Sequence, residues 1–269
     1  PALEKLTQIS DYPGLRAQQA RRRADGELVG LGLALYVEPC GQGWESARVQ
    51  IDADGQITAA TGSSAQGQGR ETAAQQIVAD VLGVAPETIR IVHGDTDLAP
   101  AGIGALASRS TAIGGSALLA AAREVVALKL ADPHRTTYEA EVVYEATGEA
   151  WSYGGCLAVL SVDPLTGVVT VEKLFWIDDA GTVVNPMLVK GQITGGVAQG
   201  LGEALMEKIV YDEAGQLLTG SLMDYAVPRA VDMPDLEIHQ FSTASPMNEL
   251  GAKGVGEAGT IGAPAAVMN

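Results

Sequence analysis

The chain has 269 residues, with 17 Lys and Arg against 33 Asp and Glu, which gives a formal net charge of −16. This length and the 46% hydrophobic content allow one large domain or two small ones and argue against a disordered chain. The negative charge disfavours binding to a nucleic-acid backbone, because that affinity comes from clustered Lys and Arg. The one basic run, Arg21 to Arg23, is too short for such a surface, and we expect it to be solvated.

The two cysteines, Cys40 and Cys156, limit the metal chemistry that this chain can hold. They are too few for a four-thiolate zinc site or an iron–sulfur cluster, and a single disulfide between them stays open. The longest apolar stretch in the sequence, Leu28 to Val37, is too short to cross a membrane. The chain begins with Pro1 instead of Met, so we expect a truncated N-terminus. We also expect a cytoplasmic protein.

The first half of the chain predicts a lead-in, several strands and two helices. Residues 1–26 are polar and Arg-rich and are predicted to be irregular or helical. Asp54-Gly55 is typical of a hairpin turn, and Gly83 is a natural stop for the helix before it. The predicted strands span 28–37, 47–52, 56–60 and 86–93, and the predicted helices span 71–82, after a Gly-rich loop at 62–69, and 110–130.

The second half repeats this plan. Its predicted strands span 156–162 and 168–178, with turns at 163–167 and 212–215. Asn185 and Pro186 then supply an N-cap and a first-turn proline. The helix beyond them continues to about Glu207, although several glycines interrupt its pattern.

Twice, therefore, a hairpin leads through a polar, Gly-containing loop into a helix. This pattern predicts an α+β protein of two related lobes, each an antiparallel sheet packed with helices. We place the first lobe at 27–134 and the second at 150–269, after a lead-in at 1–26. The boundary is expected in the polar stretch 132–149.

Familiar catalytic signatures are missing from the sequence. His93, His134 and His239 are scattered without metal-ligand spacing, and there is no nucleophile elbow, P-loop or complete dinucleotide fingerprint. What stands out instead is a set of small, polar loops ahead of helices, at Gln66–Gly69 and Ala107–Thr111. The free N–H groups at a helix start favour a phosphate or another anion, so these loops fit a polar ligand or simply tight turns.

The segment from Asn248 to Gly262 carries an acid, Glu257, directly among glycines. With little bulk beside it, this carboxylate can reach into a site and act as a general base. On spacing alone, a solvent-exposed Glu in a flexible loop is the simpler interpretation.

Taken together, five stretches resemble the molybdenum-binding large subunit of the xanthine oxidase family, which includes aldehyde oxidoreductases and carbon monoxide dehydrogenases. They are GQGRET (67–72), HGDT (93–96), ASRST (107–111), GQITGGVAQGLGEAL (191–205) and GAKGVGEAGTIGAP (251–264). Each stretch is weak alone, whereas their order and spacing are specific. The resemblance runs from about residue 27 to the end and corresponds to the latter part of that subunit.

The resemblance implies a pyranopterin (molybdopterin) cofactor with molybdenum, commonly in its cytosine dinucleotide form, and no metal ligand from the protein itself. The residues that match cofactor-binding positions are Gln66, Gly67, Gln68, Gly69, Ala107, Ser108, Ser110, Thr111, Gln192 and Gly256. The residue that matches the catalytic base is Glu257. Fold and activity would then be those of a molybdopterin-binding domain in a molybdenum hydroxylase, which oxidises an aldehyde, an N-heterocycle or CO with oxygen from water.

Two departures from the family pattern matter. Arg70 stands where many members have His, and the family's upstream half is absent. The [2Fe–2S] clusters and FAD that carry electrons away would belong to partner subunits, and we expect this chain to be inactive alone. An alternative is a non-catalytic cofactor-binding or assembly module of such a complex, and a phosphate-ligand hydrolase is a third possibility. The substrate stays undecided.

Overall fold

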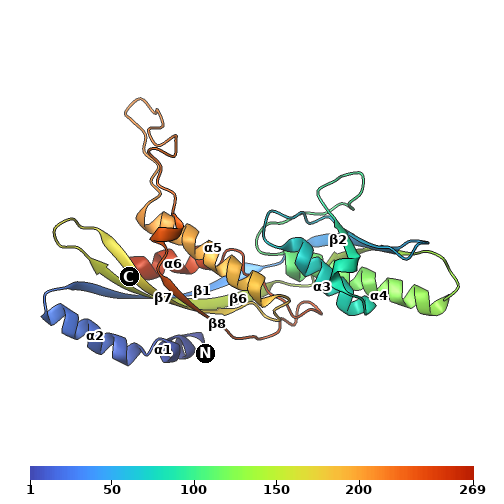
Figure 1. Cartoon of the computed structure of the whole chain (residues 1–269), viewed down its shortest axis with the longest axis horizontal. Helices are drawn as coiled ribbons and strands as arrows, with labels where there is room; N and C mark the ends of the chain where they lie inside the picture. The colour runs from blue at the N-terminus through green and yellow to red at the C-terminus, as the bar shows by residue number, and fades with distance from the viewer.

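A computed structural model describes all 269 residues, which form two sheets and the helices that cover them (Figure 1). The α-helices are α1 (Ala2–Ile9), α2 (Tyr12–Ala24), α3 (Arg70–Leu82), α4 (Gly115–Ala131), α5 (Pro186–Leu205) and α6 (Ala258–Met268). The strands are β1 (Leu28–Cys40), β2 (Trp44–Ile51), β3 (Ile57–Thr61), β4 (Ile89–Val92), β5 (Tyr138–Glu145), β6 (Ala150–Val162), β7 (Val169–Asp179) and β8 (Asp235–Gln240). Short 3₁₀ turns lie at Pro86–Thr88 and Ala230–Asp232, and a π-helical turn spans Ser110–Gly114.

The two sheets define two lobes, which lie at opposite ends of the long axis (Figure 1). Lobe A is built on the sheet β1-β6-β7-β8 and carries α1, α2, α5 and α6. Lobe B is built on the sheet β4-β3-β2-β5 and carries α3 and α4. The mixed architecture of two helix-covered sheets confirms the predicted fold class.

Lobe A is buried on both faces of its sheet. On β7, Leu174 and Trp176 point into a core with α5 and α6, whereas Phe175 and Ile177 point into a second core with Leu6 of α1. Because side chains alternate between the faces of a strand, an apolar run such as this one serves two cores at once. Figure 1 shows α1 and α2 on one side of this sheet and α5 and α6 on the other.

Lobe B has a single core on one face of its sheet. Val49 on β2 and Ala59 on β3 pack against Leu118 and the neighbouring apolar residues of α4. The helical stretch Ser110–Ala131 is long and apolar enough to cross a membrane by length and composition, which the search for apolar runs in the sequence missed. Its most apolar window is 61% buried within the protein, so it serves as the core helix of lobe B.

Both lobes repeat one chain path: a hairpin, then a helix, then a strand that pairs in parallel. In lobe B, β2 and β3 form the hairpin, α3 follows, and β4 returns parallel to β3. In lobe A, β6 and β7 form the hairpin, α5 follows, and β8 returns parallel to β7. The internal repetition is therefore present, but each sheet contains one parallel pair and is not purely antiparallel as predicted.

The division between the lobes differs from the predicted one. The strand β1, placed by sequence in the first lobe, pairs along its whole length with β6, from Leu28 opposite Val162 to Cys40 opposite Ala150. The strand β5 lies in the stretch 132–149 that was predicted to be the boundary, but it pairs with β2 and therefore belongs to the sheet of lobe B. The chain thus crosses between the lobes twice, at residues 41–43 and 146–149. The sequence could not predict these crossings, because hydrophobic alternation indicates a strand but not the strand with which it pairs.

Other elements differ from their predicted bounds or were not predicted. The lead-in 1–26 is helical and covers the sheet of lobe A, and the elements β5, β8 and α6 had no predicted counterpart. The predicted turn at 212–215 lies in an arm that projects from the end of α5 (Figure 1). Cys40 and Cys156 are both buried and free, so the disulfide that the sequence left open does not form.

Candidate functional site

A cavity of about 530 Å³ lies where the two lobes meet. Lobe B contributes the loop before α3 and the segment from 105 to 111, and lobe A contributes α5, the end of β7 and the segment from 253 to 257. The polar residues on its wall are Gln66, Gln68, Arg70, Ser108, Ser110, Thr111, Thr182, Asn185, Gln192, Gln199, Lys253 and Glu257.

The structure brings the sequence-predicted site residues together. Gln66, Gly67, Gln68, Gly69, Ser108, Ser110, Thr111, Gln192, Gly256 and Glu257 all line this cavity. Ala107 is the exception: it shapes the loop but is not part of the cavity wall. Segments almost 200 residues apart in the chain thus form one site, as the ordered motifs predicted.

The loop before α3 depends on glycine. Gly67 has φ +97° and Gly69 has φ +79°, conformations that residues with a Cβ rarely adopt. A Cβ on Gly67 would point into open space, so the missing side chain leaves room in the cavity. Gly69 lies against Leu188 of α5, where a Cβ would collide. The glycines therefore let the lobes approach each other and keep the wall of the cavity open.

The loop at 107–111 holds an unusual backbone without glycine. Ala107 and Ser108 have φ +47° and +50°, a left-handed conformation that costs free energy for residues with a Cβ. The π-helical turn that begins at Ser110 follows directly, and the Ser110 hydroxyl lies 3.0 Å from that of Ser63. Such turns are frequent at functional sites, because they aim side chains that a regular helix cannot.

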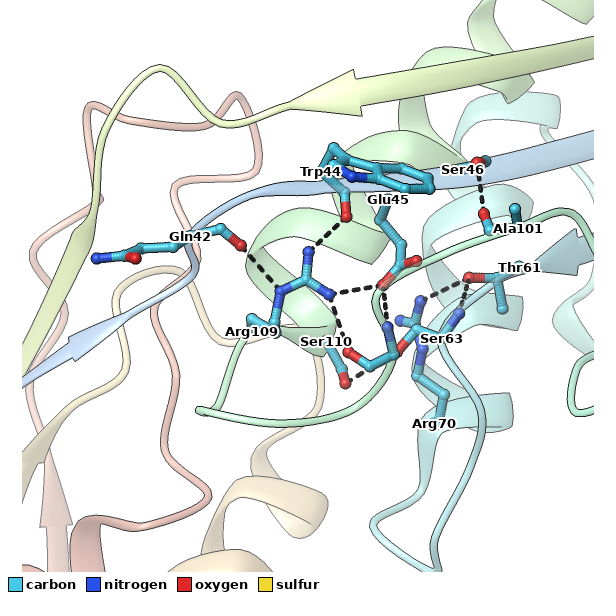
Figure 2. Close-up of polar contacts among 11 residues, drawn as sticks. Gln42, Trp44, Glu45, Ser46, Thr61, Ser63, Arg70, Ala101, Arg109 and Ser110 are labelled. Atoms are coloured by element: carbon cyan, nitrogen blue, oxygen red, sulfur yellow. Dashed lines mark hydrogen bonds and ion pairs between the residues drawn. The ribbon is translucent and has the colours of Figure 1, made fainter.

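Arg109 holds this loop in place (Figure 2). Its guanidinium donates to Glu45 Oε2 at 2.7 Å and to the carbonyl oxygens of Gln42, Trp44 and Gly104 at 2.7–3.0 Å. Both charged side chains are almost fully buried. Since Gln42 and Trp44 lie at the first crossing between the lobes, this pair ties the loop to the connection itself.

Arg70 is a second buried guanidinium beside the same carboxylate (Figure 2). Its Nη2 donates to Thr61 Oγ1 at 3.3 Å, while its Nε and Nη1 have no partner, and Glu45 Oε1 is likewise unpaired. Burial lowers the pKa of Arg70 to about 10, against the opposing effect of the Glu45 charge. Arg70, where the family resemblance led us to expect His, thus places a buried positive charge at the cavity wall.

Across the cavity, α5 begins with a cap that also joins the lobes. The Asn185 side chain accepts from the Leu188 N–H at 3.0 Å and donates to Gln76 on α3 at 2.9 Å. The predicted N-cap is therefore confirmed. Seven residues further along the chain, Gln192 presents its amide to the cavity.

The helices α5 and α6 approach each other through glycines. A Cβ on Gly259 would collide with the backbone of Gly196 and Val197, and one on Gly196 would lie 3.1 Å from Gly259. Gly196 and Gly200, two of the glycines that interrupt the predicted α5 pattern, therefore permit close packing of α5 on α6. This contact fixes the start of α6, where Glu257 lies.

The segment that leads to Glu257 is anchored at two points. Lys253 Nζ lies 2.9 Å from Asp179 Oδ2, with both side chains largely buried. Burial opposes ionisation of Asp179, but hydrogen bonds from Thr243 and Lys253 prevail and lower its pKa. The Gly254 N–H donates to Cys40 Sγ at 3.0 Å, and a Cβ at Gly254 would collide with Ser108.

Glu257 itself lies at the N-terminal end of α6, exposed on the cavity wall. The Ser108 hydroxyl donates to its Oε2, and its own backbone N–H donates to Ser108 Oγ at 3.2 Å. This reciprocal contact joins the acid from lobe A to the strained loop from lobe B. A carboxylate placed this way can accept a proton from a group bound in the cavity.

The donor set of the cavity fits a polar organic cofactor that brings its own metal. The wall offers amides and hydroxyls, which can bind the edges and phosphate of a pterin-type molecule. No group of three or more His, Cys, Asp or Glu side chains is placed to hold a metal ion. A metal in this cavity would therefore need its ligands from the cofactor.

Comparison with known proteins agrees with this chemistry. The sequence matches the molybdopterin cofactor-binding domain over residues 5–141 and 125–234, and the chain belongs to this family. The resemblance to the molybdenum-binding large subunits of the xanthine oxidase family is thereby confirmed.

Among its relatives, the chain is 31% identical to the nicotine 6-hydroxylase large subunit of Paenarthrobacter nicotinovorans, covering 99% of this chain and 40% of that protein. It is 37% identical to subunit gamma of the 6-hydroxypseudooxynicotine dehydrogenase complex of the same organism, covering 94% of this chain and 38% of that protein. Reconstituted CO dehydrogenase from Oligotropha carboxidovorans superimposes with a TM-score of 0.94 at 30% identity, over 100% of this chain and 41% of that one. The chain thus spans about two fifths of the length of these relatives.

Proposed function

We propose that the cavity between the lobes binds a molybdopterin cofactor and that Glu257 is the general base of a molybdenum hydroxylase. The convergence of the loops 66–69 and 108–111 with Gln192 and Glu257 on one cavity carries this proposal. When bound, the cofactor supplies the redox chemistry that oxidises a carbon centre with oxygen from water.

The roles of the chain's own residues follow from their positions. The amides of Gln66, Gln68 and Gln192 and the hydroxyls of Ser110 and Thr111 bind and orient the cofactor. Ser108 holds the Glu257 carboxyl by donating to it. Glu257 would accept a proton from a group held in the cavity beside the cofactor and give it up to solvent, to which it is exposed.

The active enzyme is a larger assembly. The chain spans about two fifths of its relatives, one of which is named as a subunit of a complex. We propose that the rest of the large subunit completes the site and that iron–sulfur and FAD subunits take up the electrons. The cofactor is proposed to be the cytosine dinucleotide form, and the complex to be cytoplasmic.

The substrate class is a small molecule with an oxidisable carbon. The relatives' names refer to nicotine, to 6-hydroxypseudooxynicotine and to CO. The polar groups that this chain places on the wall are largely assigned to the cofactor, to Glu257 or to contacts within the chain, so we propose that substrate selection belongs to the remainder of the enzyme.

A matched pair of variants in the assembled complex tests the proposal. Glu257→Gln keeps the size of the side chain and is expected to retain molybdenum while reducing kcat by at least 10²-fold, since a general base contributes 10²–10⁴. Glu203→Gln on the same lobe is the control, with unchanged metal content and rate. Turnover near wild type in Glu257→Gln would refute the role of the base. Molybdenum bound without oxidation of any aldehyde, heterocycle or CO in the wild-type complex would instead favour a cofactor-binding or assembly module.

A further inference from the structure

A second carboxyl group lies behind Glu257. Glu38 is on β1, in a run where Ala34, Tyr36, Glu38 and Cys40 alternate onto the buried face covered by α6. Only 6% of Glu38 is exposed, although its neighbours on that face are apolar or weakly polar. An ionised carboxylate is costly in such a place unless a partner compensates for it.

None of the main groups that act on the ionisation of Glu38 is a basic side chain. The Ser152 hydroxyl lies 3.4 Å from Glu38 Oε2. Two residues further along β1, Cys40 Sγ accepts from the Gly254 N–H, so the end of this strand lies beside the segment that carries Glu257. Burial raises the pKa of Glu38, and the Glu257 carboxyl, which acts on it at this place, raises it further. The titratable neighbours of Glu38 on β1 are Tyr36 and Cys40. Two carboxyl groups in contact are stable when they share one proton, because the protonated member then donates to the ionised one.

Resting on the proposed function of Glu257, we propose that Glu38 is a positioning residue that shares a proton with Glu257 and holds its carboxylate towards the cavity. Ser108 donates to Glu257 from the other lobe, so the base is held from two sides. Burial, followed by the Glu257 carboxyl, raises the pKa of Glu38 to about 7, which makes Glu38 the protonated member at neutral pH and below.

The pair can be tested without the cofactor, by infrared titration of the cofactor-free protein. Burial also raises the pKa of Asp178 to about 7, so the experiment is run in an Asp178→Asn background. That parent is expected to show one protonated carboxyl band that disappears near pH 7. Adding Glu38→Gln removes this band, and adding Glu257→Gln leaves it but moves its midpoint down by roughly half a unit to one unit.

Two results would overturn the proposal. A band that persists after Glu38→Gln would show that Glu38 is not the protonated group. A midpoint that Glu257→Gln leaves in place would show that the two carboxyls do not share a proton. A thermal melt of each variant at pH 5.5 checks that the protein is folded, and Glu141→Gln on the exposed edge of lobe B is a control that leaves the titration unchanged.

The assembled enzyme gives a second readout. The pH profile of kcat/KM is expected to show an ionisation near pH 7 that Glu38→Gln removes, while a purely structural role would scale the rate equally at every pH. This separates the pair from the proposed function. Normal turnover in Glu257→Gln rejects the base and leaves the infrared result standing, whereas an inactive Glu257→Gln with an unmoved midpoint rejects only the pair.

Discussion

The two walls of the cavity are held by opposite means. On lobe B, the loop at 107–111 is strained and is fixed by the buried pair of Arg109 and Glu45, with Arg70 beside them. On lobe A, the segment before Glu257 is fixed by close packing of α5 on α6 through Gly196 and Gly259. A buried charged network is destabilised when any one partner is removed, and a close glycine contact is destabilised when a single carbon is added.

The largest loss of stability is expected from a substitution in the charged network of lobe B. Arg109→Leu leaves Glu45 as a buried charge without this partner and removes four hydrogen bonds. The expected loss in free energy of unfolding is about 3–5 kcal/mol. Arg123→Leu is the control, because its pair with Glu249 is exposed and is expected to contribute less than about 1 kcal/mol. Equal losses in denaturant unfolding would refute the role of the buried pair.

On the glycine wall, the test is the addition of a methyl group. Gly259→Ala places a Cβ against the backbone of α5, so the helices must separate. The expected loss is about 1–3 kcal/mol in free energy of unfolding, together with reduced molybdenum content in the assembled enzyme. If the midpoint of denaturant unfolding is the same for Gly259→Ala and the wild type, the close contact between α5 and α6 does not hold this wall in place.

The stability of lobe A should depend on pH through Asp178, which accepts from the Tyr36 hydroxyl. Its pKa is about 7 in the folded state and near 4 when unfolded, so the folded state binds more protons between these values. Stability from this group is therefore lost as the pH rises from about 4 to 7. Between pH 5 and pH 8 this decline amounts to about 2–3 kcal/mol, which Asp178→Asn is expected to remove. Unfolding curves of both proteins at pH 5 and pH 8 measure it, and parallel declines would contradict it.

The smallest effect has the opposite sign. Gly195 is next to Gly196 on α5 but is exposed, and a Cβ there would meet nothing within 4 Å. Gly195→Ala is expected to stabilise the protein by about 0.5–1 kcal/mol, since alanine is the better helix former. Thermal unfolding measures this beside Gly196→Ala, whose Cβ would press on Gly259 and lower the Tm. A Tm of Gly195→Ala below that of the wild type would mean that α5 does not contribute to stability as a regular helix.

The sequence predicted the local parts of the site well. The loops at 66–69 and 108–111, the cap at Asn185 and the acid at Glu257 all lie on the cavity as their motifs predicted. Turn chemistry and helix starts, which neighbouring residues determine, marked the loops and the cap at Asn185. The place of Glu257 in the site came from the family resemblance alone.

What could not be predicted depends on long-range partners. The pairing of β1 with β6 is invisible to alternation, although the equal length of the two strands is consistent with it. Arg109 was passed over inside the ASRST motif, and it proved to be the residue that anchors that loop. A charge among small polar residues was the available signal. Glu38 likewise stands at an inward position of its strand, where an acid is out of place.

The central claim is that both walls together hold a metal-bearing cofactor beside Glu257. The most direct measurement is X-ray anomalous scattering at the molybdenum absorption edge from crystals of the loaded enzyme. The account predicts one molybdenum peak inside the cavity, next to the Glu257 carboxyl and facing Gln192 and the loop at 66–69. A molybdenum peak outside this cavity, with Glu257 directed at solvent, would contradict it.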